Sequence, residues 1–395
     1  MCAKAYKTRI LRLCLGVIAA GGLLAAGIAA AGSAHLRALV WCCVTSASAQ
    51  ELSPLSPTPE AFSEVLRVWT QKYKIGEAVI IVRRKGRIVH RAGIGGADPD
   101  AAYHLASLSK AITGACVAIL VRDGKLSLDT PLKDALAKFL AANGKPADPR
   151  VLQATIAQLL THRAGFSGAD DSEDAATRTT LKTYLKGHSP RDLPDPGYLS
   201  AVFRMKLVRT PGDRFAYSNA GYLALGAVIE EATGQPYETY CRNAVLTPVG
   251  ATGELEPSWR VMSSYGGWRM RGADYLAFFE QFNPTEAKFG TKMRDWMLDR
   301  TGKTYGKTRY PVWYGPGVRL RDAGRGIEIW HTGSWRRQLR PDAQGPLSAD
   351  TSTFAMRLSD GTSWFVHSTP LVTGGARAEL DRELQRAYRG VKSWN

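Results

Sequence analysis

Ser107 and Lys110 are the two residues whose types and spacing could do chemistry together, in the stretch Ser-Leu-Ser-Lys. Residues three apart lie on one face of a helix, which places the Lys110 amine beside the Ser107 hydroxyl. A serine hydroxyl needs a base to become a nucleophile, and lysine serves as that base only when burial or a neighbouring cation lowers its pKa. The same spacing also arises by chance, with Ser107 as a helix cap and Lys110 on the surface.

A second polar group stands at Tyr217-Ser218-Asn219, directly before a predicted helix over residues 220–233. A tyrosine held near a lysine can relay a proton through its phenol. The amide of Asn219 can donate to and accept from a substrate. Asn219 is also a suitable N-cap for the helix that comes next, and the two roles are compatible.

A third group is the His-Thr-Gly-Ser motif at residues 331–334, which comes after a predicted strand over residues 327–330. A glycine on an edge strand permits the close approach of a ligand backbone. The N–H of Ser334 could then point at a carbonyl oxygen and form an oxyanion hole with the N–H of Ser107. The alternative interpretation is a strand that ends in a glycine turn.

The elements that must position these groups can be read from hydrophobic periodicity. Strand patterns lie near both ends of the chain and helical patterns in the middle, which predicts an α+β fold. We expect one antiparallel sheet flanked by N- and C-terminal helices, with a mostly helical insertion over residues 125–262 and sheet parts over 61–124 and 263–395. The predicted elements are helices over 61–73, 107–122, 220–233 and 376–388, a hairpin of strands over 78–82 and 88–90, and strands over 317–321, 327–330, 353–356 and 364–367.

Taken together, the three motifs resemble those of the serine β-lactamase and penicillin-binding superfamily. The variants Ser-x-Ser-Lys, Tyr-x-Asn and His-Thr-Gly are similar to the branch of class C β-lactamases, DD-carboxypeptidases and related esterases. The stretches 159–166 and 211–226 agree with that branch, and the resemblance covers about residues 60 to 390. It implies the family's fold and no metal or cofactor. It also implies that Ser107 is acylated, that Lys110 and Tyr217 move protons, and that substrate is bound by Asn219, His331, Thr332, Gly333 and Ser334.

Two departures from the family pattern bear on the substrate. His331 stands where many relatives carry lysine, and histidine is mostly neutral at neutral pH, which makes an efficient β-lactamase less expected. A substrate carboxylate could instead meet Arg319 or Arg321 on the preceding strand. Relatives usually have a glycine-rich turn where this chain has Trp335-Arg336-Arg337-Gln338. That stretch is either a rim suited to acidic ligands or a solvated loop.

The favoured function is a DD-carboxypeptidase-like peptidase or amidase that acts on cell-wall peptides. An esterase, a β-lactamase and a membrane-tethered penicillin-binding sensor with little turnover are the alternatives. The formal net charge of +17 either keeps the surface soluble or favours anionic partners, which are lipid head groups, cell-wall polymers such as peptidoglycan, or nucleic acid. We find no nucleic-acid-binding motif.

The N-terminal 49 residues predict export. Four basic residues precede residues 13–34, which carry no charge and are long enough to span a bilayer. Ala47-Ser48-Ala49 is a small-residue cleavage pattern, so we favour a cleaved signal peptide over a membrane anchor through 13–34. Either case places the protein in the periplasm or cell envelope. Residues 50–60 then form a linker, and residues 61–395 form the hydrolase domain.

Only Cys116 and Cys241, of the six cysteines, lie in the part expected to fold. Both stand in apolar, helix-like stretches, and neither has the spacing of a metal ligand. We therefore expect two small buried hydrophobic residues rather than a disulfide framework.

Overall fold

The computed structural model describes residues 55–166, 183, 186–187, 196–306, 309–336, 349–372 and 374–394. The predicted export segment, including residues 13–34 and 47–49, lies outside these ranges, as do Arg337 and Gln338. No helix within the described ranges is long and apolar enough to cross a membrane. The chain from Ser56 to Asn395 forms one compact unit.

A seven-stranded antiparallel sheet, in the order β2-β1-β10-β9-β8-β7-β6, forms the centre of this unit. The N-terminal hairpin joins the C-terminal strands through β1, where Val79 pairs with His367. This arrangement confirms the predicted α+β fold with an antiparallel sheet. The strands are β1 (Glu77–Arg84), β2 (Arg87–Ile94), β6 (Val312–Tyr314), β7 (Arg319–Asp322), β8 (Ile327–Trp335), β9 (Thr351–Arg357) and β10 (Ser363–Thr369).

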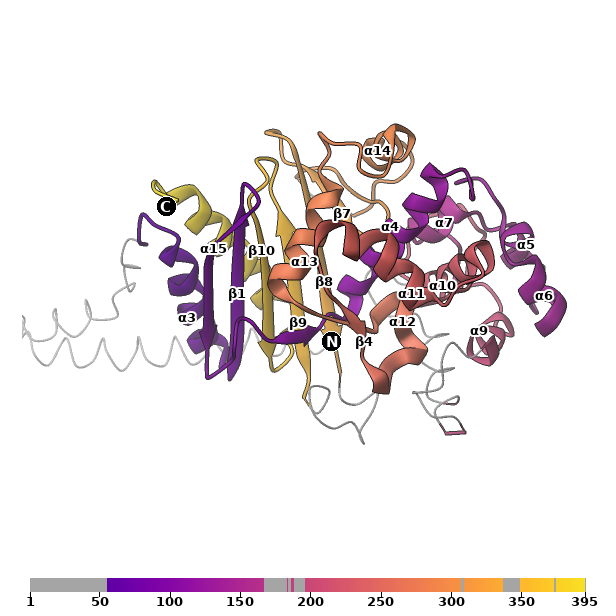
Figure 1. Ribbon diagram of the computed structural model, residues 1–395, viewed down its shortest axis with the longest axis horizontal. Helices are drawn as coiled ribbons and strands as arrows, with labels where there is room; N and C mark the ends of the chain where they lie inside the picture. The colour runs from indigo at the N-terminus through magenta and orange to yellow at the C-terminus, as the bar shows by residue number, and fades with distance from the viewer. Residues whose placement is uncertain are drawn as a thin grey trace, which may run out of the picture. The chain divides into compact units, whose positions relative to one another are not determined.

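Both faces of the sheet are covered, which explains why β1 is apolar at successive positions. Val79 and Ile81 point into the main core, and the alternate residue Ile80 points to the opposite face. On that opposite face, helices α3 (Glu60–Tyr73) and α15 (Gly374–Gly390) lie side by side (Figure 1). The indole N–H of Trp69 on α3 donates to the carbonyl of Ala376 on α15, at 2.8 Å. The two predicted terminal helices are thus confirmed.

The residues before α3 are held by the end of the chain. Backbone N–H groups of Lys392 and Ser393 donate to the carbonyl of Pro57. The N–H of Ser56 donates to the carboxylate of Glu64 within α3. The C-terminal part of the predicted linker over residues 50–60 is therefore packed onto the domain, and the helix begins at Glu60.

Helix α4 (Ser109–Arg122) lies on the other face of the sheet, between the sheet and the helical region (Figure 1). Every residue from 109 to 121 is buried. A helix that is apolar almost all round is one that is packed on all sides. The polar residues Lys110 and Thr113 are therefore buried within it and need partners from the protein.

Helices lie along the described part of residues 125–262, as expected, but further helices lie between residues 263 and 298, where a sheet part was expected. Helix α10 (Asn219–Thr233) ends at Gly234, as predicted. A second, three-stranded sheet in the order β3-β5-β4 was not predicted. Its strands are β3 (Ala102–His104), β4 (Glu254–Leu255) and β5 (Trp268–Arg271). The remaining α-helices of the described ranges are α5 (Leu132–Ala135), α6 (Ala137–Asn143), α7 (Ile156–Leu160), α9 (Pro196–Phe203), α11 (Tyr237–Cys241), α12 (Ser263–Gly266), α13 (Gly272–Phe279) and α14 (Thr291–Leu298).

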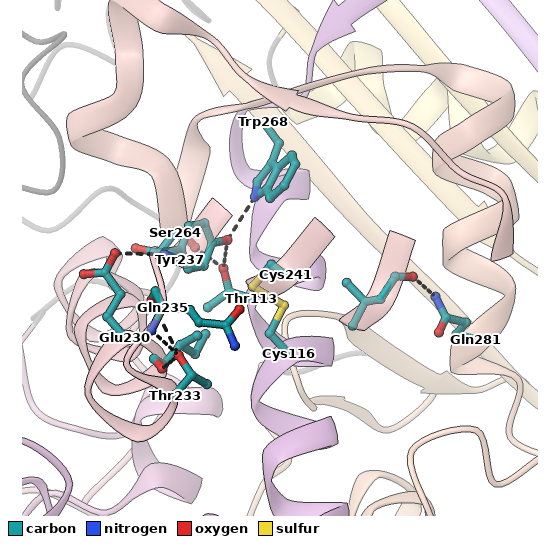
Figure 2. The surroundings of a disulfide bond; sticks show 12 residues. Thr113, Cys116, Glu230, Thr233, Gln235, Tyr237, Cys241, Ser264, Trp268 and Gln281 are labelled. Atoms are coloured by element: carbon teal, nitrogen blue, oxygen red, sulfur yellow. Dashed lines mark hydrogen bonds between the residues drawn. A yellow bond between two sulfur atoms is a disulfide. The ribbon is translucent and has the colours of Figure 1, made fainter. Parts of the chain in front are cut away.

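Cys116 and Cys241 form a disulfide, contrary to the expectation of two separate buried hydrophobic residues (Figure 2). Both side chains are fully buried, as expected, but α4 and α11 bring them together across 125 residues of sequence. Periodicity shows that each cysteine faces a core. It does not show which distant residue it meets there.

Gly114 shows how tightly α4 is packed. A Cβ atom on Gly114 would lie 2.1 Å from the carbonyl oxygen of Pro316, which is backbone and cannot give way cheaply. We predict that Gly114→Ala lowers the free energy of unfolding by about 1–3 kcal/mol, as overpacking of a core does. Urea denaturation measures this. The matched control is Gly390→Ala, also helical, where a Cβ meets nothing within 4 Å. An equal effect in both variants would contradict the prediction.

Candidate active site

Ser107 lies in the short bend between β3 and α4. Ala106, just before it, has a φ of 47°, in the left-handed region that residues with a side chain rarely adopt. The bend is fixed on both sides, because the N–H of Leu105 donates to the carbonyl of Trp268 and Thr353 donates to the carbonyl of Leu105. Ser107 itself is half-buried, whereas its two neighbours are buried. The hydroxyl is thus presented from a rigid backbone.

Lys110 is fully buried, and its amine faces three oxygen atoms. Nζ lies 3.2 Å from the Ser107 hydroxyl, 2.7 Å from Oδ1 of Asn219 and 2.9 Å from the carbonyl oxygen of Tyr265. As an ammonium, Nζ donates to all three. As a neutral amine it keeps two N–H bonds, to Asn219 and Tyr265, and its lone pair then faces Ser107. The predicted pair is therefore brought together, with a geometry in which Lys110 can accept the Ser107 proton.

Asn219 contributes an acceptor for Lys110 rather than a helix cap. The N-cap of α10 is Ser218, whose side chain accepts the N–H of Gly221. Asn219 is the first residue of the helix and is nearly buried, with its amide oxygen on Lys110. The alternative that Asn219 is the helix cap is thus wrong. Its side chain lies beside Lys110 instead.

Tyr217 is held beside Lys110 by a histidine. Its ring centroid lies 4.9 Å from Nζ of Lys110 and 4.3 Å from the ring of His162. His162 binds the chain on both sides of Tyr217, because its carbonyl accepts the N–H of Ala216 and its Nδ1 accepts the N–H of Ser218. His162, which lies in the stretch 159–166 that agrees with the family pattern, therefore positions Tyr217.

His331 lies within β8 rather than after its end, because the strand continues to Trp335. The ring is 1% exposed. Its Nδ1–H donates to the carbonyl of Thr332, at 2.8 Å, which leaves Nε2 to accept from the hydroxyl of Tyr314, at 2.7 Å. Burial, and then the positive charge of Arg319, hold the pKa of His331 well below its usual value. The imidazole is therefore neutral at neutral pH, as the sequence suggested, and both of its nitrogens are occupied.

The remaining motif residues lie on a strand edge. Strand β7 pairs with residues 327–330 of β8, and beyond them β8 is bonded to β9 alone among the described strands. Alternate residues of an antiparallel strand direct their N–H and C=O groups to opposite sides, so this edge offers both. Thr332 is half-buried and Ser334 is exposed there. The hydroxyl of Ser334 accepts from Arg377 of α15, at 3.0 Å.

Gly333 was expected to leave room for a ligand backbone, but the space beside it is filled by the chain itself. A Cβ atom there would lie 2.5 Å from the carbonyl oxygen of Leu105 and 3.1 Å from Cβ of Ala106. The close approach is therefore to the chain's own backbone beside Ser107, rather than to a ligand. The predicted glycine turn is likewise absent at Gly333, since the residue pairs with Thr353 in the sheet. The contact holds β8 against the bend that carries Ser107.

Trp335 is not part of a rim, because it is the last residue of β8 and is 2% exposed. Its ring packs edge-on against His104, with centroids 5.5 Å apart. Residue 335 pairs with Thr351 of β9 and so continues the strand, and no turn begins there.

Arg319 and Arg321, the two candidates for a substrate carboxylate, have different surroundings. Arg321 donates to Glu328, which is 1% exposed and also pairs with Arg325. Arg319 lies over Tyr217, with its guanidinium carbon 6.0 Å from the ring centroid, and donates to the hydroxyl of Tyr305. Arg319 is therefore the arginine of the two that stands beside the motif residues.

Several residues of the site were not predicted. The carbonyl of Tyr265 has no sequence signal, because any residue can offer a backbone oxygen. Tyr314 stands in a short strand that the pattern did not reveal. In the described ranges, no group of three or more His, Cys, Asp or Glu residues is placed to hold a metal ion.

Comparison with known proteins adds a relative of similar sequence. Protein flp of Staphylococcus aureus (strain NCTC 8325 / PS 47) is 27% identical over 223 residues. The match covers 54% of this chain and 42% of that protein, so the chain spans less than half the length of this relative.

Solved structures share the fold at low sequence identity. A D-stereospecific amidohydrolase from Streptomyces sp. superimposes with a TM-score of 0.63 and 18% identity, covering 82% of this chain and 98% of that chain. EstCE1, a hydrolase with promiscuous acyltransferase activity, gives a TM-score of 0.60 and 16% identity, covering 82% and 99%. A family model described as Beta-lactamase matches residues 60–378, well over half of the sequence. With the motifs assembled around one buried lysine, the chain belongs to the beta-lactamase family of hydrolases.

Proposed function

We propose that the protein is a serine hydrolase that forms an acyl-enzyme at Ser107 and acts as a DD-carboxypeptidase-like peptidase or amidase on cell-wall peptides. The observation that carries the proposal is the position of Lys110, whose amine lies 3.2 Å from the Ser107 hydroxyl and is also held by Asn219 and the carbonyl of Tyr265. A lysine so placed can take a proton from the nucleophile and return it.

The reaction can be written from this geometry. Ser107 attacks the carbonyl carbon of the substrate while its proton passes to Nζ of Lys110. The N–H groups of Ser107 and Ser334 stabilise the negative charge on the substrate oxygen. The proton reaches the leaving amine through Lys110 and Tyr217, and the C–N bond breaks. Water then attacks the ester, giving the acid product and free Ser107. Asn219 and Thr332 bind the substrate, beside Gly333 and His331.

The choice of a peptide with a free carboxylate rests on charge. His331 is neutral and already bonded at both nitrogens. The positive charge beside Tyr217 comes from Arg319 on the neighbouring strand. A guanidinium suits a carboxylate because its N–H groups match the two oxygen atoms. The fold shared with a D-stereospecific amidohydrolase is consistent with this substrate class.

An esterase is the second candidate, because EstCE1 shares the fold and an ester needs no carboxylate partner. A β-lactamase is less favoured, since the position that is lysine in many relatives is a neutral histidine here. A low-turnover, membrane-tethered penicillin-binding sensor is a further alternative that shares the acylation step and differs in hydrolysis.

Export to the periplasm or cell envelope is part of the proposal. The basic head and uncharged segment of residues 1–49 support it. The Cys116–Cys241 disulfide supports it independently, because disulfides persist in oxidising compartments. Peptidoglycan, which carries free carboxylates, is then an accessible partner, and it suits a chain that still has 47 basic against 35 acidic residues after residues 1–49 are removed.

We predict that a fluorophosphonate probe adds covalently to Ser107, and that mass spectrometry finds the adduct on the peptide containing this residue. Ser107→Ala should abolish both the adduct and all turnover, because the attacking oxygen is lost. Ser200→Ala, a partly exposed serine on α9, is the control and should label normally. A labelled Ser107→Ala variant would show that the nucleophile lies elsewhere.

Turnover of a peptide ending in D-Ala-D-Ala, compared with a short p-nitrophenyl ester, separates the two leading functions. We expect release of D-alanine. Hydrolysis of the ester alone would exclude the peptidase and favour the esterase. A penicilloyl adduct that never hydrolyses, together with no turnover of either substrate, would favour the sensor.

Arg319→Ala should lower kcat/KM for the D-Ala-D-Ala peptide, relative to its value for the uncharged ester, by about tenfold or more, because one charged hydrogen-bonding partner is lost. Arg321→Ala is the matched control. It removes a partner of buried Glu328 and should reduce thermal stability without changing the ratio between the substrates. An unchanged ratio in Arg319→Ala would exclude this arginine as the carboxylate partner.

A further inference from the structure

Helix α11 touches α4 at two points one helical turn apart (Figure 2). The hydroxyl of Tyr237, at the start of α11, lies 2.7 Å from Oγ1 of Thr113. Cys241, at its end, is bonded to Cys116. Tyr237 and Cys241 are four residues apart and Thr113 and Cys116 are three apart, so each pair lies on one face of its helix. We call these four residues the α11 clamp.

The contact between Tyr237 and Thr113 belongs to a chain of hydrogen bonds in which the donor and acceptor of each bond are determined. Oγ1 of Thr113 donates to the carbonyl of Ser264, at 2.5 Å, so its only proton is used. Tyr237 must then donate its own proton to Thr113. The oxygen of Tyr237 in turn accepts the indole N–H of Trp268, at 2.9 Å. Every donor in this buried chain is satisfied, and removal of any one leaves a neighbour unpaired.

This chain of hydrogen bonds ends beside Lys110, the proposed base. Thr113 is one turn beyond Lys110 on α4, and Ser264 directly precedes Tyr265 on α12. Thr113 and Lys110 thus donate to consecutive carbonyls, those of Ser264 and Tyr265. Loss of the first bond removes the tie between α12 and α4 that lies next to the second bond, so we expect the second bond to shift with it.

The same segment is tied to α4 at a third place. The backbone N–H of Trp268 donates to Oγ of Ser109, at 3.1 Å, and its carbonyl accepts the N–H of Leu105. Trp268 therefore bonds to residues on both sides of Ser107 with its backbone, and to Tyr237 with its side chain. The clamp, α12 and the bend of the nucleophile form one connected structure.

We propose that Thr113 and Tyr237 are positioning residues, which hold the Tyr265 carbonyl at the distance at which it fixes the Lys110 amine toward Ser107, and that the Cys116–Cys241 bond holds α11 in place for this purpose. This inference rests on the proposed function. Neither hydroxyl contacts Ser107 or the substrate, so both act through Lys110. Burial raises the pKa of Tyr237, and the phenol accordingly stays protonated as the donor that the chain requires.

The test compares Thr113→Val, which keeps the shape but lacks the hydroxyl, with Thr113→Ser, which keeps the hydroxyl. The readout is the rate of Ser107 labelling by a fluorophosphonate at increasing probe concentration, which separates the maximal rate constant from the concentration giving half that rate. We expect Thr113→Val to lower the maximal rate constant about tenfold, since a small misplacement of a catalytic group is costly. The half-maximal concentration should change less than about twofold, and Thr113→Ser should restore most of the rate.

Tyr237→Phe is the second variant and should behave like Thr113→Val. Its matched control is Tyr73→Phe, which loses a hydrogen bond of the same 2.7 Å length, from Tyr73 to Glu379 on the far side of the sheet. Melting temperatures are recorded for all variants, and labelling is measured well below each of them. A purely structural role predicts lower melting temperatures with unchanged maximal labelling rates, and that result overturns the proposal.

The disulfide is tested with the double variant Cys116→Ala and Cys241→Ala, which should also lower the maximal labelling rate. An unchanged rate there, with a reduced rate in Thr113→Val, overturns the part assigned to the disulfide. A natural protein that is not labelled at Ser107 overturns the proposed function and the clamp together. A natural protein that is labelled no faster than Thr113→Val and Tyr237→Phe overturns the clamp alone.

Discussion

The buried amine of Lys110 is the constraint on which the rest of the site depends. Helix α4 is packed on all sides, so protein atoms must supply the partners that water would otherwise give. The helical region supplies two of them, Asn219 from α10 and the carbonyl of Tyr265 from α12. The third is Ser107, one helical turn before the lysine. The free energy cost of burying the Lys110 amine is thus offset by contacts that also determine where its proton can go.

The His-Thr-Gly motif carries a histidine at the position where many relatives have a positively charged lysine. In this chain, a positive charge lies on Arg319 of strand β7 instead. The imidazoles of His162 and His331 are both buried among aromatic rings, and burial lowers the pKa of each well below its usual value. Nearby cations add to the effect, Lys110 for the first and Arg319 for the second. Two neutral rings therefore lie near the Lys110 amine and the Arg319 guanidinium. The two imidazoles fill space and bond to backbone groups through Nδ1, whereas the positively charged Arg319 lies on the adjacent strand β7.

Much of the fold was predictable because the local patterns agree with the tertiary structure. The hairpin of β1 and β2, the helices α3, α10 and α15, and the end of α4 are where periodicity and glycine signals placed them, whereas α4 begins at Ser109 rather than at residue 107. The pairs that meet across long sequence distances were not predictable from local pattern, as with Cys116 and Cys241. The extent of β8 was missed for a related reason. Residues 331–335 continue the strand because β9 pairs with them and the core covers His331 and Trp335, and both facts depend on distant parts of the chain.

The disulfide has a topological consequence. It joins residues 116 and 241, so the chain between them, which includes α5, α6, α7, α9 and α10, is a covalently closed loop. A protease that cuts once anywhere inside this loop produces two polypeptides that stay attached through sulfur. One of them carries Ser107 and Lys110, and the other carries β8 with the His-Thr-Gly residues. Such a nicked molecule runs as one species until it is reduced, and it retains every residue of the site in a single covalent assembly.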